Sequence, residues 1–336
     1  MTTSPTMRIS AAVLPCALAL ACVPIKPAGE SEGSSAPVPL QEYFQARRYG
    51  ALSFDLSFSH DDRLAAFQSD AGGRLDLWVA PLDGGPARQL THVEGFIGGF
   101  AFSPAADVLV YEADVGGDEL PHLFLTDSNG SAPRDLTADY PKGRRTQFVR
   151  WAPDGRTFLY LSNLRDQKLL DLYEYDLASG RSQLIWIASG SLAFGVPDRA
   201  HRRFALRETL SDKDSNLWLF ERGEEQPVLL TPHQGQVLYQ PLDFTHDGKL
   251  LFTSDQEGEY TGLYSLDPST RRASPLAQQP WDVDSAAESL RHRYRWVAVN
   301  ADGTNRLSVQ DLQSGKAVAL PEAPSGGGWF PSDFSP

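Results

Sequence analysis

Cysteine is almost absent from this chain of 336 residues, and the absence limits its chemistry. The only two cysteines, Cys16 and Cys22, both lie within the first 22 residues, so the chain after them folds without a disulfide and has no thiol. Residues 39–336 also lack the pattern Gly-x-Ser-x-Gly, which presents a nucleophilic serine on a strand-to-helix turn; the nearest sequence, Ser189-Gly190-Ser191, has neither flanking glycine. We therefore predict no catalytic residue in this chain.

Positive charge is scarce as well. The chain has 30 lysines and arginines against 43 acidic residues, which gives a formal net charge of −13. Nucleic-acid binding needs a clustered basic surface that neutralises phosphates, so the composition argues against a nucleic-acid partner. The seven histidines show no metal-type spacing such as His-x-x-x-His with a carboxylate, and we predict neither a metal site nor a cofactor.

Long apolar runs are missing, with one short exception near the N-terminus. Ile9–Ala21 follows a positive residue, Arg8, and is too short to span a bilayer as a stable anchor. It ends in Leu18-Ala19-Leu20-Ala21-Cys22, which resembles a bacterial lipobox. We predict a lipoprotein signal peptide over residues 1–21 and acylation of Cys22. Residues 22–38 are rich in Pro, Gly, Ser and Glu and are interpreted as a flexible tether.

This N-terminal pattern predicts a protein of the bacterial cell envelope, held at the membrane by its lipidated Cys22. Two acyl chains are sufficient for stable membrane attachment, whereas one is marginal. Val23 stands after the cysteine where an Asp would favour retention in the inner membrane. In a Gram-negative host we therefore expect the outer membrane, facing the periplasm.

One short phrase recurs about every 45 residues, a period that is typical of a β-propeller with one four-stranded blade per repeat. Its copies are Phe58–Asp62, Phe102–Pro104, Trp151–Gly155, Phe244–Gly248 and Phe334–Pro336. Residues 39–336 are thus predicted to form an all-β propeller of six recognisable four-stranded blades plus the first strand of a seventh. One short helix, Pro39–Tyr49, is expected before the first blade, since Pro39 suits a first helical position.

The repeat, with its Phe-Ser-Pro-Asp-Gly phrase and its Leu-Thr ending, resembles the TolB-like and WD40-like propeller repeat. Glu112–Glu119, followed by Leu123-Phe124, is similar to an Asp-x-x-Gly-x-Glu segment in an early blade of the S9 serine peptidases, the family of prolyl oligopeptidase, dipeptidyl peptidase IV and acylaminoacyl peptidase. The predicted helix leading into the first blade is a second similarity. The resemblance implies a non-catalytic propeller that caps an α/β-hydrolase domain with a Ser-Asp-His triad, and that domain would follow the last blade.

No residue of that triad is present, so two explanations stay open. The chain is either the front part of such a peptidase, with a hydrolase domain encoded downstream or lost, or a stand-alone lipoprotein propeller. A weaker third interpretation is a propeller enzyme that acts through its own channel, as some lyases and lactonases do. Such an enzyme needs clustered His, Glu and Asn ligands at the ends of the inner strands, and these strands are mostly apolar here.

Few residues are candidates for binding. Asp118 and Glu119 are neighbouring carboxylates that could hold a cation or an amine, in a family whose propeller acids help to hold substrate termini; the alternative is a solvated turn whose Asp bonds its own backbone. Asp212, Asp214, Asp282 and Asp284 are interpreted as charged loop residues. The resulting prediction is a non-catalytic envelope lipoprotein that binds a protein or peptide ligand, or alternatively the substrate-selecting gate of an S9-type peptidase.

Overall fold

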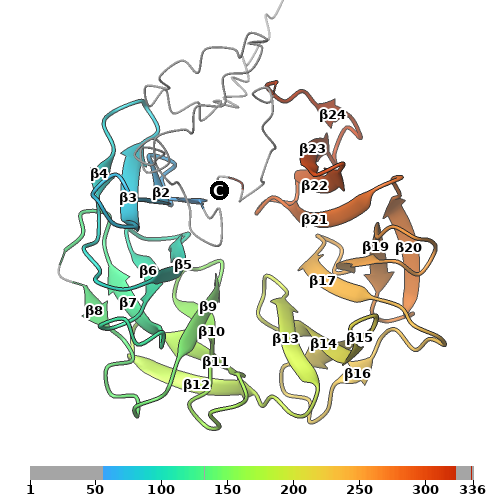
Figure 1. Ribbon diagram of the computed structural model, residues 1–336, viewed down its shortest axis with the longest axis horizontal. Helices are drawn as coiled ribbons and strands as arrows, with labels where there is room; N and C mark the ends of the chain where they lie inside the picture. Colours follow the sequence, from blue (N-terminus) through green and yellow to red (C-terminus); the bar gives the residue numbers. More distant parts are fainter. Residues whose placement is uncertain (1–55, 132, 323–333, 335–336) are drawn as a thin grey trace, which may run out of the picture. The chain divides into compact units, whose positions relative to one another are not determined.

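The computed structural model describes residues 56–131, 133–322 and 334, and every regular element within them is a β-strand. All described residues belong to one compact unit, residues 47–336. Its strands form six antiparallel sheets of four consecutive strands each, which are the six blades of a propeller (Figure 1). The predicted all-β fold with six four-stranded blades is confirmed.

The blades follow the chain order. Blade 1 consists of β1 (Leu56–Phe58), β2 (Leu64–Ser69), β3 (Asp76–Pro81) and β4 (Arg88–Gln89). Blade 2 consists of β5 (Ile97–Phe102), β6 (Leu109–Ala113), β7 (His122–Thr126) and β8 (Arg134–Asp135). Blade 3 consists of β9 (Thr146–Trp151), β10 (Thr157–Ser162), β11 (Asp171–Asp176) and β12 (Arg181–Trp186).

The second half repeats this arrangement. Blade 4 consists of β13 (Leu192–Pro197), β14 (Arg203–Ser211), β15 (Asp214–Glu221) and β16 (Val228–Leu229). Blade 5 consists of β17 (Tyr239–Phe244), β18 (Leu250–Ser254), β19 (Gly262–Asp267) and β20 (Arg272–Ala277). Blade 6 consists of β21 (Asp282–Glu288), β22 (Tyr294–Ala301), β23 (Thr304–Asp311) and β24 (Ala317–Val318). The interpretation of Asp214, Asp282 and Asp284 as loop residues is wrong, because Asp214 lies in β15 and the other two lie in β21.

Several predictions fall outside the described residues. These are the signal peptide over residues 1–21, the lipidated Cys22, the tether over residues 22–38 and the helix Pro39–Tyr49. Of the predicted strand of a seventh blade only Phe334 is described, and its ring stacks on that of Tyr294 with the centroids 6.2 Å apart. Among the described residues, no helix has the length and apolar character needed to cross a membrane.

The repeated phrase forms one particular turn between the first and second strands of a blade. The fourth residue of the turn has a positive φ, and its N–H donates to the carbonyl three residues earlier at 2.8–3.1 Å. This residue is Asp62, Gly155, His201, Gly248 and His292 in blades 1, 3, 4, 5 and 6 respectively. Glycine adopts this conformation without strain, whereas Asp and His are tolerated less well. Blade 4, whose phrase is unrecognisable in the sequence, therefore has the same turn with His201 in place of glycine.

The core lies between blades. Each of the five neighbouring pairs of blades shares one cluster of buried side chains. The cluster between blades 2 and 3 is the most aromatic, with Trp151, Phe158, Tyr160, Tyr173 and Tyr175 all buried. These aromatic side chains form the core between the two blades.

Because the strands of a blade alternate in direction, their connections fall at two opposite ends of the propeller. At the end that we call the turn end lie the loops that join first to second strands. At the other, the crossover end, lie the loops that join second to third strands and the connections into the next blade. The first strands contact each other in the pairs β1–β5, β5–β9, β13–β17 and β17–β21. Between β9 and β13 lies a cleft instead.

Blades 3 and 4 are joined on their outer side by Glu174 in β11. The guanidinium of Arg222 donates to both of its carboxylate oxygens, at 3.1 and 2.7 Å, and Nδ1 of the buried His201 lies 3.5 Å from Oε1, an ion-pair distance. The pKa of Glu174 is lowered from its ordinary value of 4.5 to about 2, first by His201 and then by Arg222, against the opposing effect of burial.

We expect acid to weaken the protein through this carboxylate. Because its folded pKa is depressed, its stabilisation is fully present above pH 4.5 and is lost as the pH falls toward 2. The stabilisation at neutral pH is about 3 kcal/mol. Glu174→Gln should lower the free energy of unfolding in urea at pH 6, and its difference from wild type should shrink by pH 3. Glu225→Gln, at an exposed site, serves as the control; an identical pH dependence in Glu174→Gln and wild type would contradict the assignment.

Candidate functional site

The wide turn of blade 2, between β6 and β7, lies at the crossover end and holds both predicted ligand residues. Asp114 is buried, and its carboxylate accepts the N–H groups of Phe96 at 2.6 Å and Glu119 at 3.2 Å. These bonds hold Glu119 in the left-handed region, at φ +59°. The exposed Asp118 accepts the N–H of Leu120 at 3.0 Å, so its side chain caps its own turn. The two side chains thus differ in role: that of Asp118 caps its own turn, and that of Glu119 lines a hollow.

That hollow, which we call the acidic hollow, lies between blades 2 and 3 and has a volume of about 380 Å³. Its two carboxylates are those of Glu119 and Glu112. Glu112, in β6, is only 6% exposed, and its Oε1 accepts the N–H of Phe148 at 2.6 Å. A Cβ on Gly98 or Gly99 would lie 2.6 or 2.9 Å from that carboxylate, so both glycines of β5 make room for it.

Sequence reasoning did not single out Glu112 as a site residue, although it lies at the start of the segment that carries the family resemblance. The available signal was the glycine pair in the neighbouring strand. Two adjacent glycines inside an otherwise apolar strand indicate a close approach of another group.

A second hollow, which we call the cationic cleft, separates β9 from β13 and has a volume of about 550 Å³. Its charged side chains are Arg145, Arg150 and Lys168, and it has no acidic lining residue. Each of its two walls has a β-bulge, at Val149 in β9 and at Gly195 in β13. Such bulges bend a strand and redirect its side chains. The cleft and the acidic hollow share Arg145, Gln147 and Leu170, so they adjoin at the crossover end of blade 3.

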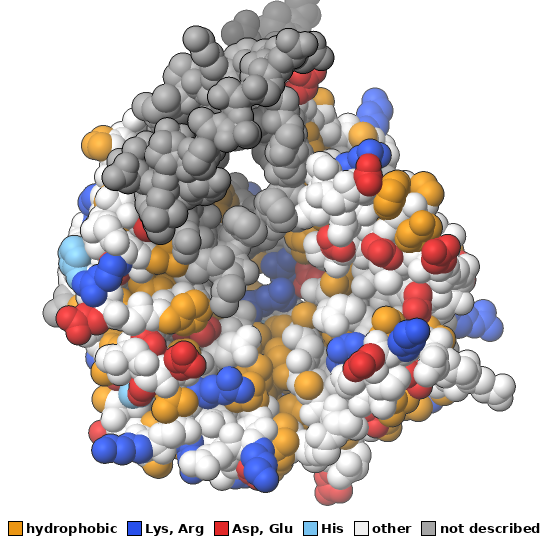
Figure 2. Space-filling model, viewed as in Figure 1, with side chains coloured by type: hydrophobic (Ala, Val, Ile, Leu, Met, Phe, Trp, Pro, Cys, Tyr) orange, Lys and Arg blue, Asp and Glu red, His pale blue; other side chains and the backbone are white. Residues whose placement is uncertain are grey.

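At the turn end, ionised side chains from blades 3 to 6 meet in what we call the axial ion cluster. The Asp243 side chain, 2% exposed, lies 3.3 Å from Nη1 of Arg150 and 3.6 Å from Nη2 of Arg199. Nη2 of Arg199 also donates to the carbonyl of Glu288 at 2.8 Å. In the space-filling view, basic and acidic side chains face the opening between the blades (Figure 2).

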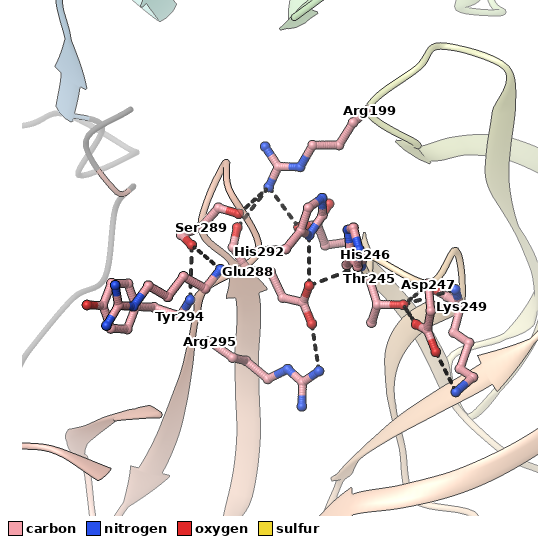
Figure 3. Close-up of polar contacts among 12 residues, drawn as sticks. Arg199, Thr245, His246, Asp247, Lys249, Glu288, Ser289, His292, Tyr294 and Arg295 are labelled. Atoms are coloured by element: carbon pink, nitrogen blue, oxygen red, sulfur yellow. Dashed lines mark hydrogen bonds and ion pairs between the residues drawn. The ribbon is translucent and has the colours of Figure 1, made fainter. Parts of the chain in front are cut away.

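Glu288, from β21, is the second buried acid of the cluster. Its carboxylate accepts from Nη2 of Arg295 at 2.6 Å and lies 2.8 Å from Nδ1 of His292 (Figure 3). It also accepts the N–H of His246, at 3.2 Å, from the turn of blade 5 (Figure 3). Both buried carboxylates are therefore engaged by cations from other strands or blades, which makes the cluster a link between blades.

The described residues contain no Gly-x-Ser-x-Gly sequence. The spacing Gly-x-Ser-x-Gly does occur once in the chain, at Gly29–Gly33, in the stretch predicted as a tether and outside the described residues. Metal ligands are not clustered either: nowhere in residues 56–131 and 133–322 do three His, Cys, Asp or Glu side chains group so that they could hold a metal ion.

Known proteins resemble the chain in two ways. A dipeptidyl aminopeptidase, BIII of Pseudoxanthomonas mexicana, is 29% identical over 238 residues, which cover 68% of this chain and 34% of that protein. The chain therefore spans about a third of the length of this relative. No known family profile matches the chain.

Solved structures share its fold. A prolyl endopeptidase matches with a TM-score of 0.63 and 13% identity over 83% of this chain and 44% of that one. An oligogalacturonate lyase in complex with manganese matches with a TM-score of 0.62 and 18% identity over 79% of this chain and 75% of that one. At these identities the likeness shows the fold alone. The chain is thus a six-bladed β-propeller, related in fold to the propeller of a prolyl endopeptidase and similar in sequence to part of a dipeptidyl aminopeptidase.

Proposed function

We propose that this chain is a non-catalytic propeller that binds peptides, with the acidic hollow receiving the amino end of the peptide. The observation that carries the proposal is the convergence of Glu112 and Glu119 on one hollow at the crossover end. Its volume of about 380 Å³ lies within the range of about 300–1,000 Å³ that is usual for small-molecule sites. Carboxylates form their strongest hydrogen bonds with charged donors, and the ammonium group of a peptide is such a donor.

The two carboxylates differ in what they can offer a ligand. Glu112 is buried and already accepts a backbone N–H of blade 3, so it contributes mainly a fixed negative charge. Glu119 is exposed at the rim, and its backbone is held by Asp114. We therefore assign the direct contact with a ligand to Glu119.

Glu119→Gln should weaken the binding of a peptide with a free amino end, such as Ala-Phe amide, by about tenfold or more. A hydrogen bond to a charged group contributes about 1.5–3 kcal/mol, and about 1.4 kcal/mol corresponds to tenfold in Kd. The measurement is isothermal titration calorimetry with the full chain. Asp118→Asn is the matched control, because its side chain caps its own turn, and its affinity should equal that of wild type. Equal affinity of Glu119→Gln and wild type, or of the N-acetylated and the free peptide, would refute the proposal.

A second candidate function is that of a substrate-selecting gate in an S9-type peptidase. The specific observation in its favour is the similarity of 68% of the chain to a third of a dipeptidyl aminopeptidase. In this role the hollow would hold the substrate for a hydrolase domain that follows the propeller. Both candidate functions use the acidic hollow, and they differ in whether a hydrolase domain is attached to the propeller.

The mass of the native protein separates these candidates. We place it in the bacterial envelope, anchored through Cys22 as the N-terminal pattern predicts, so the membrane fraction is the material to examine. An antibody to the propeller that detects a band near 36.9 kDa would favour a stand-alone lipoprotein. A band about 30 kDa heavier, the size of one large added domain, would favour the gate of a tethered peptidase.

A further inference from the structure

The cationic cleft has a charge opposite to that of the protein as a whole. In a chain with a formal net charge of −13, its charged lining consists of Arg145, Arg150 and Lys168 alone. Arg150 is fixed at the turn end of β9 by Asp243, at 3.3 Å, and by the carbonyl of Pro197, at 3.2 Å. Arg145 and Lys168 lie nearer the crossover end and are exposed.

Arg145 and Lys168 form no ion pair with any described residue. Within the described part of the chain, no carboxylate lies within 4.0 Å of the charged nitrogens of either side chain. Asp166, in the loop before Lys168, bonds the backbone N–H of Lys168 at 2.9 Å. On the other side, Glu112 and Glu119 line the adjoining hollow.

The remaining walls of the cleft are mostly apolar. Phe148 and Val149 come from β9, Leu170 from the loop before β11, and Leu192, Phe194 and Val196 from β13. Two exposed cations at one end of an apolar cleft of about 550 Å³ fit an organic anion whose charged group is attached to an apolar body.

We propose that the cationic cleft is a second binding site, for a carboxylate attached to an apolar residue, as found at the carboxyl end of a peptide or on an acidic side chain within one. Arg145 and Lys168 bind the carboxylate, and the apolar side chains of β9 and β13 cover the neighbouring residue. Arginine suits this task because its planar fork can hold both oxygens of a carboxylate. The cleft deepens the proposed function, since it adjoins the acidic hollow, but its own binding does not need an amino group.

The experiment uses the full chain and probes with a blocked amino end, so that the acidic hollow has no ammonium group to bind. N-acetyl-Ala-Phe has a free terminal carboxylate, and N-acetyl-Ala-Phe amide lacks it. N-acetyl-Asp-Phe amide supplies a side-chain carboxylate instead. Binding of each probe is measured by isothermal titration calorimetry to wild type and to Arg145→Gln, Lys168→Gln and the double variant.

At least one of the two carboxylate probes is expected to bind about tenfold or more tightly than N-acetyl-Ala-Phe amide. Whichever probe binds identifies the source of the carboxylate. The double variant should lose that advantage, and each single variant part of it. Arg181→Gln, at an exposed arginine of β12 in the same blade, is the matched control and should bind like wild type.

Three results would overturn the site. The first is that neither carboxylate probe binds better than N-acetyl-Ala-Phe amide. The second is that the double variant, with an unchanged melting temperature, binds the carboxylate probes like wild type. The third is that Glu119→Gln abolishes the binding of the acetylated carboxylate probe. The last result would mean that the two hollows act as one site that depends on Glu119. If Glu119→Gln instead leaves the carboxylate probe bound and also leaves Ala-Phe amide binding unchanged, the cleft stands while the proposed role of the acidic hollow fails.

Discussion

Replacing Asp243 by alanine is expected to lower the free energy of unfolding by about 3–5 kcal/mol, the usual cost of removing one partner from a buried ion pair. The Asp243 side chain is 2% exposed and lies between Arg150 of blade 3 and Arg199 of blade 4. Without it, two guanidinium groups face each other with no shared counter-charge. The loss should fall at the lower end of the range, because the two arginine side chains keep 31% and 21% exposure to water.

The measurement is urea unfolding followed by tryptophan fluorescence, with Asp243→Asn as a second variant that keeps the shape and removes the charge. Asp247→Ala is the matched control from the turn of the same blade. Its ion pair with Lys249 is 2.6 Å long, but both side chains are about half exposed, so the loss should stay below about 1 kcal/mol. If Asp243→Ala and Asp247→Ala cost the same, the axial ion cluster does not link the blades.

Phe158→Ala should produce a loss of similar size by a different mechanism. Phe158 is fully buried between blades 2 and 3, with its ring centroid 5.1 Å from that of Trp151 and 5.2 Å from that of Tyr175. Truncation removes its contacts and leaves a cavity among rigid aromatic rings that cannot close it. Substitutions of this kind cost about 3–5 kcal/mol.

Phe158→Leu tests whether volume is the cause, because it restores most of the packing and should cost clearly less than the alanine variant. Leu184→Ala, at a leucine of the same blade that is 40% exposed, is the control and should have a small effect. Urea midpoints at neutral pH report all three variants. Equal losses in Phe158→Ala and Phe158→Leu would mean that ring contacts, and not filled volume, stabilise this interface.

The sequence predicts the blades well because their signals are local. A strand such as Thr157–Ser162 follows the Asp154-Gly155 turn of the repeated phrase. The turn of blade 4 shows where such reasoning fails. Asp198 caps it through the N–H of Arg202, and His201 adopts the conformation that glycine has elsewhere, so the geometry persists after its sequence signal has been lost.

Local sequence patterns do not predict the two hollows or the axial ion cluster. Arg150 and Asp243 are 93 positions apart, and their pairing depends on how three blades are oriented around the axis. The separation of Asp118 from Glu119 depends on which carboxylate closes the turn, and hydrogen bonds from three backbone N–H groups decide that. The cationic cleft depends on the spacing between β9 and β13, which no residue in either strand specifies alone.

The uneven sharing of core residues around the ring has a consequence for hydrogen exchange. Only three buried side chains, Leu263, Val283 and Ala286, form the cluster between blades 5 and 6, whereas seven form the one between blades 2 and 3. No residue of β23 is buried, while five of the six residues of β10 are. A blade with little shared core opens at a lower free energy than the molecule as a whole. We therefore expect the amides of blade 6 to exchange by local opening of that blade, and the amides of blade 3 to exchange only on global unfolding.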